Sequence, residues 1–189
     1  MDAFAGGLIV QSMLSLWLVQ RFALSPTALG ALFFATSLLS GASYLAAVPL
    51  ARRFGLINTM VFTHIPSSVA LIAIPFAGNV DAVVALLLVR SALSQMDVPT
   101  RSSYTMAVVA PRERAAAASA TAVPRSLAAA GSPLLSGYLL GLSALGWPLV
   151  LAGAIKIAYD LALLAIFRNV RPPEEAQRAT RATPLRRAP

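Results

Sequence analysis

Long apolar segments that contain a few charged residues constrain this chain more than any other feature of its sequence. Two such segments lie between Leu86 and Pro133, and Arg90, Asp97 and Arg125 lie inside or at the edge of them. The segments are too long and too apolar for a soluble helix with one wet face, so we interpret them as membrane spans. A charge within a span costs at least about 2.5 to 3.5 kcal/mol on insertion scales, so each of these side chains is expected to face a polar interior.

The composition of the whole chain agrees with this interpretation. Of the 189 residues, 58% are hydrophobic and only 12% are charged, which is about half the charge of an ordinary soluble domain. The absence of cysteine excludes disulfides and thiolate metal sites. The formal charge of +8 comes from arginines in short loops and the tail, so we expect a lipid bilayer as the partner and no nucleic acid.

Turn and loop signals divide the chain into six expected helices and a tail. Pro26 after Ser25 suits the opening of the second helix, and Pro99 ends the fourth. The fifth is expected to bend near Pro124 or Pro133. The expected spans are residues 3–20, 27–51, 56–76, 81–98, 115–140 and 149–167, within one transmembrane domain over residues 1–169. Residues 170–189 are rich in proline and charge and lack apolar periodicity, which predicts a disordered basic tail.

The distribution of arginine predicts the orientation of these spans. The loops after the second and fourth spans, together with the tail, hold Arg52, Arg53, Arg101, Arg112, Arg114, Arg168, Arg171, Arg178, Arg181, Arg186 and Arg187. The opposite loops hold only Arg21. Because positive residues favour the cytoplasmic side, we expect a multi-pass protein of a cell's inner (plasma) membrane with both termini in the cytoplasm.

Three short motifs occur in order along these spans. The loop LARRFG ends in Arg52, Arg53 and Gly55 and is similar to a known cytoplasmic signature, although Arg52 stands where that signature has aspartate. Arg90 within LLLVRSALSQ resembles the counterpart, in the second half of a two-half protein, of an arginine motif on the fourth helix. A glycine-proline motif on a fifth helix is echoed by Gly131, Pro133 and Gly137. In this order, over about residues 2–170, the motifs resemble the C-terminal half of a major facilitator superfamily transporter, and in particular its bacterial efflux members.

The resemblance implies both a fold and a function. The fold would be all-α and integral to the membrane, with six transmembrane helices forming half of a twelve-helix major facilitator fold. The first, second, fourth and fifth spans would line a central cavity, and the third and sixth would pack outside. Transport would proceed by rocking of two halves around a site near the bilayer midplane. The implied protein is a secondary active transporter of small molecules, with proton-coupled efflux favoured, whose partner is a missing N-terminal half or a second copy.

Polar side chains within the spans are the candidates for binding substrate or a coupling ion. The two deep arginines are expected either to attract anionic groups and help a carboxylate release its proton, or to be helix-packing residues satisfied by backbone carbonyls. For Asp97 we expect a pair with Arg101 at the cytoplasmic gate, with proton carriage as the alternative. The candidates are Arg90, Arg125, Asp97, Gln11 and Tyr44.

Three further polar residues lie on the third and sixth spans. Lys156 and Asp160 are spaced i, i+4 on the sixth span, so they are expected to meet on one helical face and neutralise each other. His64 is the only histidine, and we expect a polar residue at the membrane interface, with a proton relay as the alternative.

The sequence does not favour an enzyme. It contains no Ser, His and Asp set in a plausible common site, no pair of histidines with metal spacing and no glycine-rich phosphate loop after a strand, so we expect no catalytic residues, cofactor or metal. Two alternatives to a transporter half stay open. One is a stand-alone six-span carrier or channel acting as a homodimer, and the other is a membrane assembly subunit that does not transport.

Overall fold

The described part of the protein is built from helices. The computed structural model describes residues 1–96, 98, 109–143 and 145–167. Within these ranges the α-helices are α1 (Asp2–Leu8), α2 (Gln11–Phe22), α3 (Pro26–Phe54), α4 (Leu56–Ala73), α5 (Val80–Ser94), α7 (Arg114–Leu142) and α8 (Trp147–Phe167). Two short 3-10 helices, η1 (Ile74–Phe76) and η2 (Pro111–Glu113), follow α4 and precede α7. The described ranges contain no strand.

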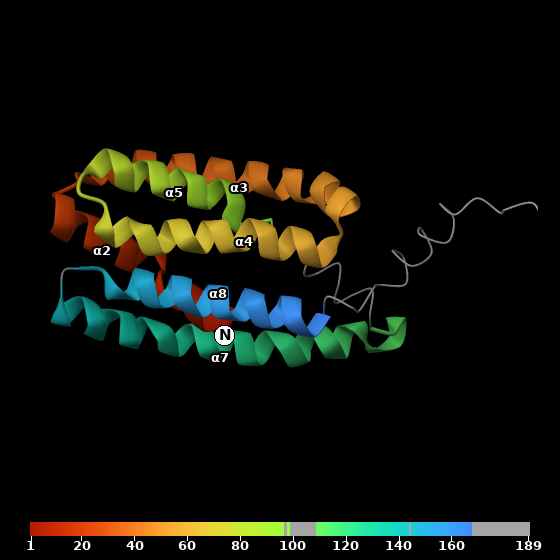
Figure 1. The fold of residues 1–189 in the computed structure, drawn as a ribbon. Helices are drawn as coiled ribbons and strands as arrows, with labels where there is room; N and C mark the ends of the chain where they lie inside the picture. The colour runs from red at the N-terminus through yellow and green to blue at the C-terminus, as the bar shows by residue number, and fades with distance from the viewer. Residues whose placement is uncertain (97, 99–108, 144, 168–189) are drawn as a thin grey trace, which may run out of the picture.

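The helices form a bundle in which their axes run in roughly the same direction (Figure 1). α4 packs against α8, α5 packs against both α3 and α4, and α1 packs against both α7 and α8. The N-terminus lies beside α7 and α8, about halfway along their length (Figure 1).

Among the described residues, four helical segments are long and apolar enough to cross a membrane. They are Asp2–Phe22, Pro26–Phe54, Asn58–Phe76 and Trp147–Ile166, and they coincide with the first, second, third and sixth predicted spans. α5 has 15 described residues, and α7 is rich in alanine and carries Arg125. The crossing of the membrane by these two helices stays a prediction.

Local sequence chemistry accounts for several helix ends. The Ser25 side chain accepts a hydrogen bond of 3.2 Å from the Ala28 N–H, and Pro26 opens α3 directly after this cap. Asn79 caps α5 in the same way, accepting from the Ala82 N–H at 2.8 Å. Gly55 separates α3 from α4 with a φ of 86°, a conformation that favours glycine.

Two features bear on the predicted first and fifth spans. The first span is interrupted, because α1 ends at Leu8 and α2 begins at Gln11 after Val10 adopts a φ of −56° and a ψ of 149°. In contrast, α7 continues as one α-helix past both Pro124 and Pro133. A proline inside a helix removes only one backbone donor, and neighbouring helices or side chains in a membrane bundle compensate for it.

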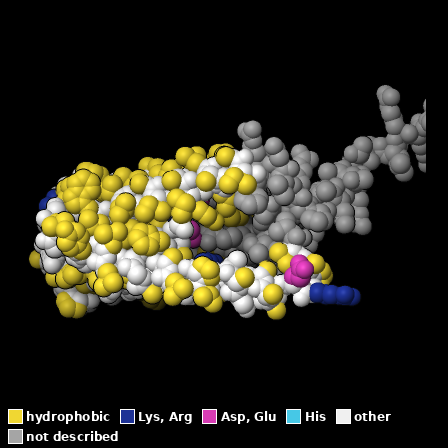
Figure 2. Space-filling view, turned by 90° about the horizontal axis from the view of Figure 1, so that it is seen from below, with side chains coloured by type: hydrophobic (Ala, Val, Ile, Leu, Met, Phe, Trp, Pro, Cys, Tyr) yellow, Lys and Arg dark blue, Asp and Glu magenta, His cyan; other side chains and the backbone are white. Residues whose placement is uncertain are grey.

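The buried core lies between the helices, and the outside is largely apolar. Trp17, Leu18, Leu71, Ile74 and Leu87 are all at most 2% exposed. Large apolar side chains also lie on the surface, such as Phe34, Leu45 and Leu134. Figure 2 shows one face on which hydrophobic side chains cover most of the described surface and charged ones are few. Such a surface suits a hydrocarbon environment.

Candidate functional site

A cavity of about 490 Å³ lies among α2, α3 and α5. This volume falls within the range of about 300 to 1,000 Å³ that is typical of small-molecule sites. Apolar side chains such as Leu32 and Phe33 form part of the wall. Hydroxyl and amide groups form much of the rest, including those of Gln11, Thr36, Ser37, Ser40, Tyr44 and Gln95.

Helical spacing brings these polar groups to one wall. On α3, the lining residues Thr36, Ser40 and Tyr44 recur every four positions, so they lie above one another on one helical face. Two hydrogen bonds then join this face to α5. The Tyr44 hydroxyl donates to Gln95 Oε1 at 3.1 Å, and the Ser40 hydroxyl donates to the Ser91 carbonyl at 3.5 Å.

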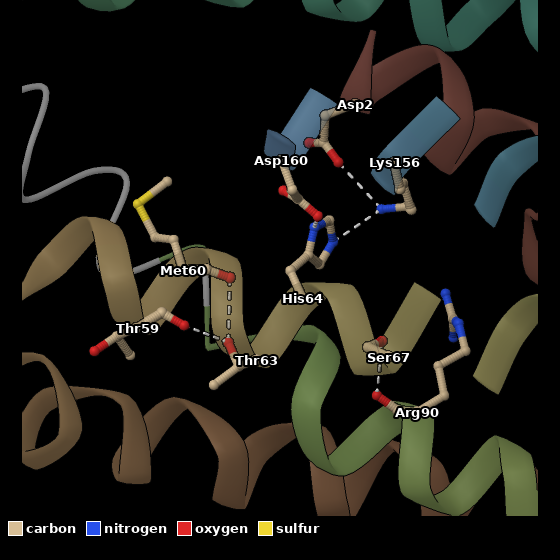
Figure 3. A network of polar contacts seen from close by, with 9 residues as sticks. All are labelled: Asp2, Thr59, Met60, Thr63, His64, Ser67, Arg90, Lys156 and Asp160. Atoms are coloured by element: carbon tan, nitrogen blue, oxygen red, sulfur yellow. Dashed lines mark hydrogen bonds and ion pairs between the residues drawn. The ribbon is translucent and has the colours of Figure 1, made fainter. Parts of the chain in front are cut away.

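Arg90 gives the cavity its charge. It lies on α5 and lines the cavity, and the described lining residues include no Asp or Glu. Within the described residues its guanidinium forms no ion pair, while its backbone carbonyl accepts a hydrogen bond of 3.3 Å from Ser67 of α4 (Figure 3). The cavity therefore combines one unneutralised cation with neutral hydrogen-bonding groups, an arrangement that attracts a negatively charged group.

The cavity brings together three of the five predicted substrate or coupling residues. Gln11 and Tyr44 lie in its wall with Arg90. Arg125 is exposed on α7 and does not line this cavity. α7 itself, predicted as a lining helix, contributes none of the described lining residues because its packed face lies against α1. Asp97 lies outside the described residues.

The residues of the two remaining motifs lie away from the cavity. Arg52 and Arg53 are exposed in the last turn of α3, and the Arg53 guanidinium lies 5.5 Å from the centroid of the Phe54 ring. Gly131 and Gly137 are exposed on α7, and a Cβ added to either would meet nothing within 4 Å. Pro133 lies between them inside the continuous α7. Packing within the described chain therefore does not require glycine at either position.

A second polar cluster, which we call the His64 network, lies between α4, α8 and α1 (Figure 3). His64 Nδ1 lies 2.7 Å from Asp160 Oδ2, and the two side chains are 3% and 5% exposed. Lys156 Nζ lies 3.1 Å from Asp2 Oδ1 and 3.3 Å from His64 Nε2. Four ionisable side chains from three helices thus form one buried chain of contacts.

The His64 network differs from what the residue spacing predicted. Lys156 pairs with Asp2 rather than with Asp160, although the latter is one turn away on the same helix. His64 is only 2% exposed, so its side chain lies between the helices rather than on the outside of the bundle. The signal available in the sequence was the cost of charge in apolar segments, which applies to Asp2, Lys156 and Asp160 alike.

No group of three or more His, Cys, Asp or Glu side chains in the described ranges is arranged to hold a metal ion. The His64 network contains three such residues, but a lysine ammonium lies between Asp2 and the imidazole. A cation in that position would repel a metal ion.

Comparison with known proteins matches the sequence of this chain to one family. The sequence model of the Major Facilitator Superfamily matches residues 2–189. The uncharacterized membrane protein YJR124C of Saccharomyces cerevisiae is 26% identical over 170 residues, which cover 89% of this chain and 38% of the yeast protein. The chain thus spans well under half the length of that relative.

Proposed function

Because the chain belongs to the major facilitator superfamily, we propose that it is the C-terminal six-helix half of a secondary active transporter that exports small molecules in exchange for protons. The superfamily is one of multi-pass membrane transporters, whose sites lie near the bilayer midplane between two halves. The substrate and the direction of transport belong to the proposal, as does the second half.

The observation that carries the proposal is the cavity around Arg90. Its volume of about 490 Å³ suits a small molecule, and its wall offers hydroxyl and amide groups for orientation. An arginine inside a membrane bundle is costly, so its position on a cavity wall favours a role in binding. We infer that the substrate, or a carboxylate that exchanges the coupling proton, places a negative charge beside Arg90.

The exposed face of α7 supports a second half. Arg125 is exposed there, within a stretch of α7 in which every residue from 121 to 127 is exposed. Lipid would leave the arginine charge without a partner, whereas a second six-helix half could cover this face and supply one. The yeast relative, of which the chain matches 38%, has the length for such a half. A second copy of the chain is the alternative occupant and corresponds to the homodimeric carrier.

The ends of the helices support a cytoplasmic location for both termini in an inner (plasma) membrane. Arg52 and Arg53 lie in the last turn of α3. Arg112 lies in η2 and Arg114 begins α7, at the same end of the bundle (Figure 1). Basic residues gather on the cytoplasmic side of membrane proteins.

The proposal is tested with the complete transporter in lipid vesicles that carry an imposed proton gradient. A pH-sensitive dye reports loss of the gradient when monocarboxylates, dicarboxylates, sugar phosphates, neutral sugars or cationic drugs are added. We expect one of the anionic classes to dissipate the gradient. A response to no class, with the protein correctly inserted, would contradict proton-coupled transport.

The variants Arg90→Ala and Arg90→Lys locate the site. The alanine variant should insert normally, because deleting an intramembrane charge eases insertion, but should lose coupled flux. The lysine variant should recover little, because an ammonium cannot hold two acceptors as the planar guanidinium does. Val89→Ala is the matched control, since Val89 is the neighbouring residue on α5 and 52% exposed. Wild-type flux in the alanine variant would mean that Arg90 is a helix-packing residue and does not act in transport.

A further inference from the structure

We propose that the His64 network is a proton-binding site of the transporter, separate from the Arg90 cavity, and that binding of the proton loosens the contact between α4 and Lys156 of α8. This inference rests on the proposed proton coupling. The site lies between the third and sixth spans, the pair that the resemblance places outside the central pathway.

The partners of His64 fix where its protons lie. Lysine ammonium has donors only, so His64 Nε2, 3.3 Å from Lys156 Nζ, must accept a hydrogen bond. An imidazole with an accepting Nε2 carries its hydrogen on Nδ1, which donates to Asp160 Oδ2 at 2.7 Å. His64 is therefore neutral in this arrangement, and Nε2 is the ring atom that can take up a proton.

The charges of the network leave room for one proton. The carboxylates of Asp2 and Asp160 contribute two negative charges and Lys156 one positive charge, so with neutral His64 the sum is −2 + 1 = −1. The His64 and Asp160 side chains are 3% and 5% exposed, and those of Lys156 and Asp2 are 13% and 14% exposed. Over these four side chains, one added proton brings the sum to zero, which favours its uptake in such surroundings.

The surrounding helices supply other ionisable groups, but none is bonded to His64. Within the described residues, His64 bonds only to Asp160 and Lys156. The ionisable residues on the helices that pack against the network are Tyr44, Arg52 and Arg53 on α3, Asp81 and Arg90 on α5, Arg114, Arg125 and Tyr138 on α7 and Tyr159 on α8.

Protonation would change the contacts between helices in a defined way. A proton on Nε2 turns the acceptor into a donor, so the hydrogen bond from Lys156 is lost and two cations face each other. Lys156 would then move toward Asp2, while the Nδ1–H of the imidazolium stays on Asp160. α4 and α8 pack closely here, since a Cβ at Gly153 of α8 would lie 2.9 Å from the Ser68 carbonyl of α4. A shift of Lys156 would therefore change the packing of α4 against α8.

The first test observes the proton on the wild-type protein. Nitrogen NMR of the ¹⁵N-histidine-labelled complete transporter in lipid is recorded from about pH 8 to pH 5, the range in which histidine side chains ordinarily titrate. We expect the His64 signal, assigned by its loss in His64→Asn, to pass reversibly from the neutral Nδ1–H form to imidazolium. A signal that keeps one form throughout would overturn the proposal.

The second test separates proton coupling from substrate binding. His64→Asn retains an amide N–H near the place of Nδ1 but cannot take up a proton. With the anion that dissipates the gradient as the probe, this variant should lose gradient-driven flux and retain exchange of labelled for unlabelled anion across the vesicle membrane. Ser68→Ala is the matched control one turn along α4, because the Ser68 hydroxyl is buried and has no hydrogen-bond partner among the described residues.

The outcomes of the two tests are distinguishable. Retained gradient-driven flux in His64→Asn would overturn the proton site while leaving transport intact. If that variant does not reach the membrane, His64→Gln assigns the signal in its place, and the titration of wild-type His64 decides alone. If wild-type vesicles exchange no anion, the proposed function fails, and the titration still reports whether the network binds a proton.

Discussion

The Ser136 hydroxyl donates a hydrogen bond of 2.7 Å to the backbone carbonyl of Leu8, which joins α7 to the end of α1. Leu8 is the last residue of α1, where the first span is interrupted, so its carbonyl lies at a helix end inside the bundle. Both residues are fully buried. Irregular backbone at membrane depth persists only where protein groups satisfy it, and Ser136 does so here.

Ser136→Ala should therefore destabilise the protein. The substitution leaves the Leu8 carbonyl buried without this donor, which costs about 1 to 3 kcal/mol. The measurement is the melting temperature of the purified protein in detergent, which should fall. Ser126→Ala, at an exposed position on the same helix, is the control and should melt as wild type does. Equal melting temperatures for both variants would show that the interruption does not depend on this bond.

Two adjacent glycines on α1 provide a second prediction. A Cβ at Gly7 would collide with the Ser132 hydroxyl and lie 2.6 Å from the Ala129 carbonyl, both on α7, whereas a Cβ at Gly6 would meet nothing within 4 Å. Gly7→Ala should thus separate α1 from α7 and lower the melting temperature. Gly6→Ala should be neutral or stabilising by about 0.5 to 1 kcal/mol, because alanine favours a helix over glycine. The reverse order would contradict the packing of α1 on α7.

Local chemistry explains which helix ends could be predicted from the sequence. Pro26 after a serine cap begins α3 one residue before the predicted start, and Gly55 separates α3 from α4 as a tight turn. The interruption at Ile9 and Val10 could not be predicted, because neither residue is a turn signal. The Leu8 carbonyl at this interruption accepts a hydrogen bond from the Ser136 hydroxyl, and Ser136 is 128 positions away in the sequence.

The polar sites likewise divide into those that local sequence predicts and those that depend on contacts between helices. Gln11 and Tyr44 were identified from their place on predicted cavity helices, and helical spacing from Arg90 would also have indicated Ser94. The His64 network was missed because a rule of local spacing paired Lys156 with Asp160. Contacts between helices decided otherwise, and sequence spacing carries no information about which helices become neighbours.

The ion pair of Lys156 and Asp2 gives a third prediction. Lys156→Met removes the cation that is paired with Asp2, and the two side chains are 13% and 14% exposed. Removal of one partner of a fully buried pair costs about 3 to 5 kcal/mol, which is the upper bound for this partly buried pair. The double variant Asp2→Asn with Lys156→Met removes both charges, so it should recover much of the lost stability. Thermal unfolding in detergent measures both. A double variant less stable than Lys156→Met would show that the two residues do not act as a pair.

Single cysteines test the orientation of the bundle, since the chain itself contains none and any elsewhere in the complete transporter can be removed. Gly78, between η1 and α5, is the better external site, because it is exposed and an added Cβ would meet nothing within 4 Å. Gly146 is unsuitable, because its φ is +81° and a Cβ would lie 2.8 Å from Trp17 Nε1. If arginines mark the cytoplasmic side, Gly78→Cys should react with an impermeant maleimide only from outside, and Arg53→Cys only after the membrane is opened. Arg53 lies just before α4, and Gly78 lies beyond its other end. Labelling of both from one side would therefore mean that α4 does not cross the membrane. The reverse pattern would mean that the bundle has the opposite orientation in the membrane.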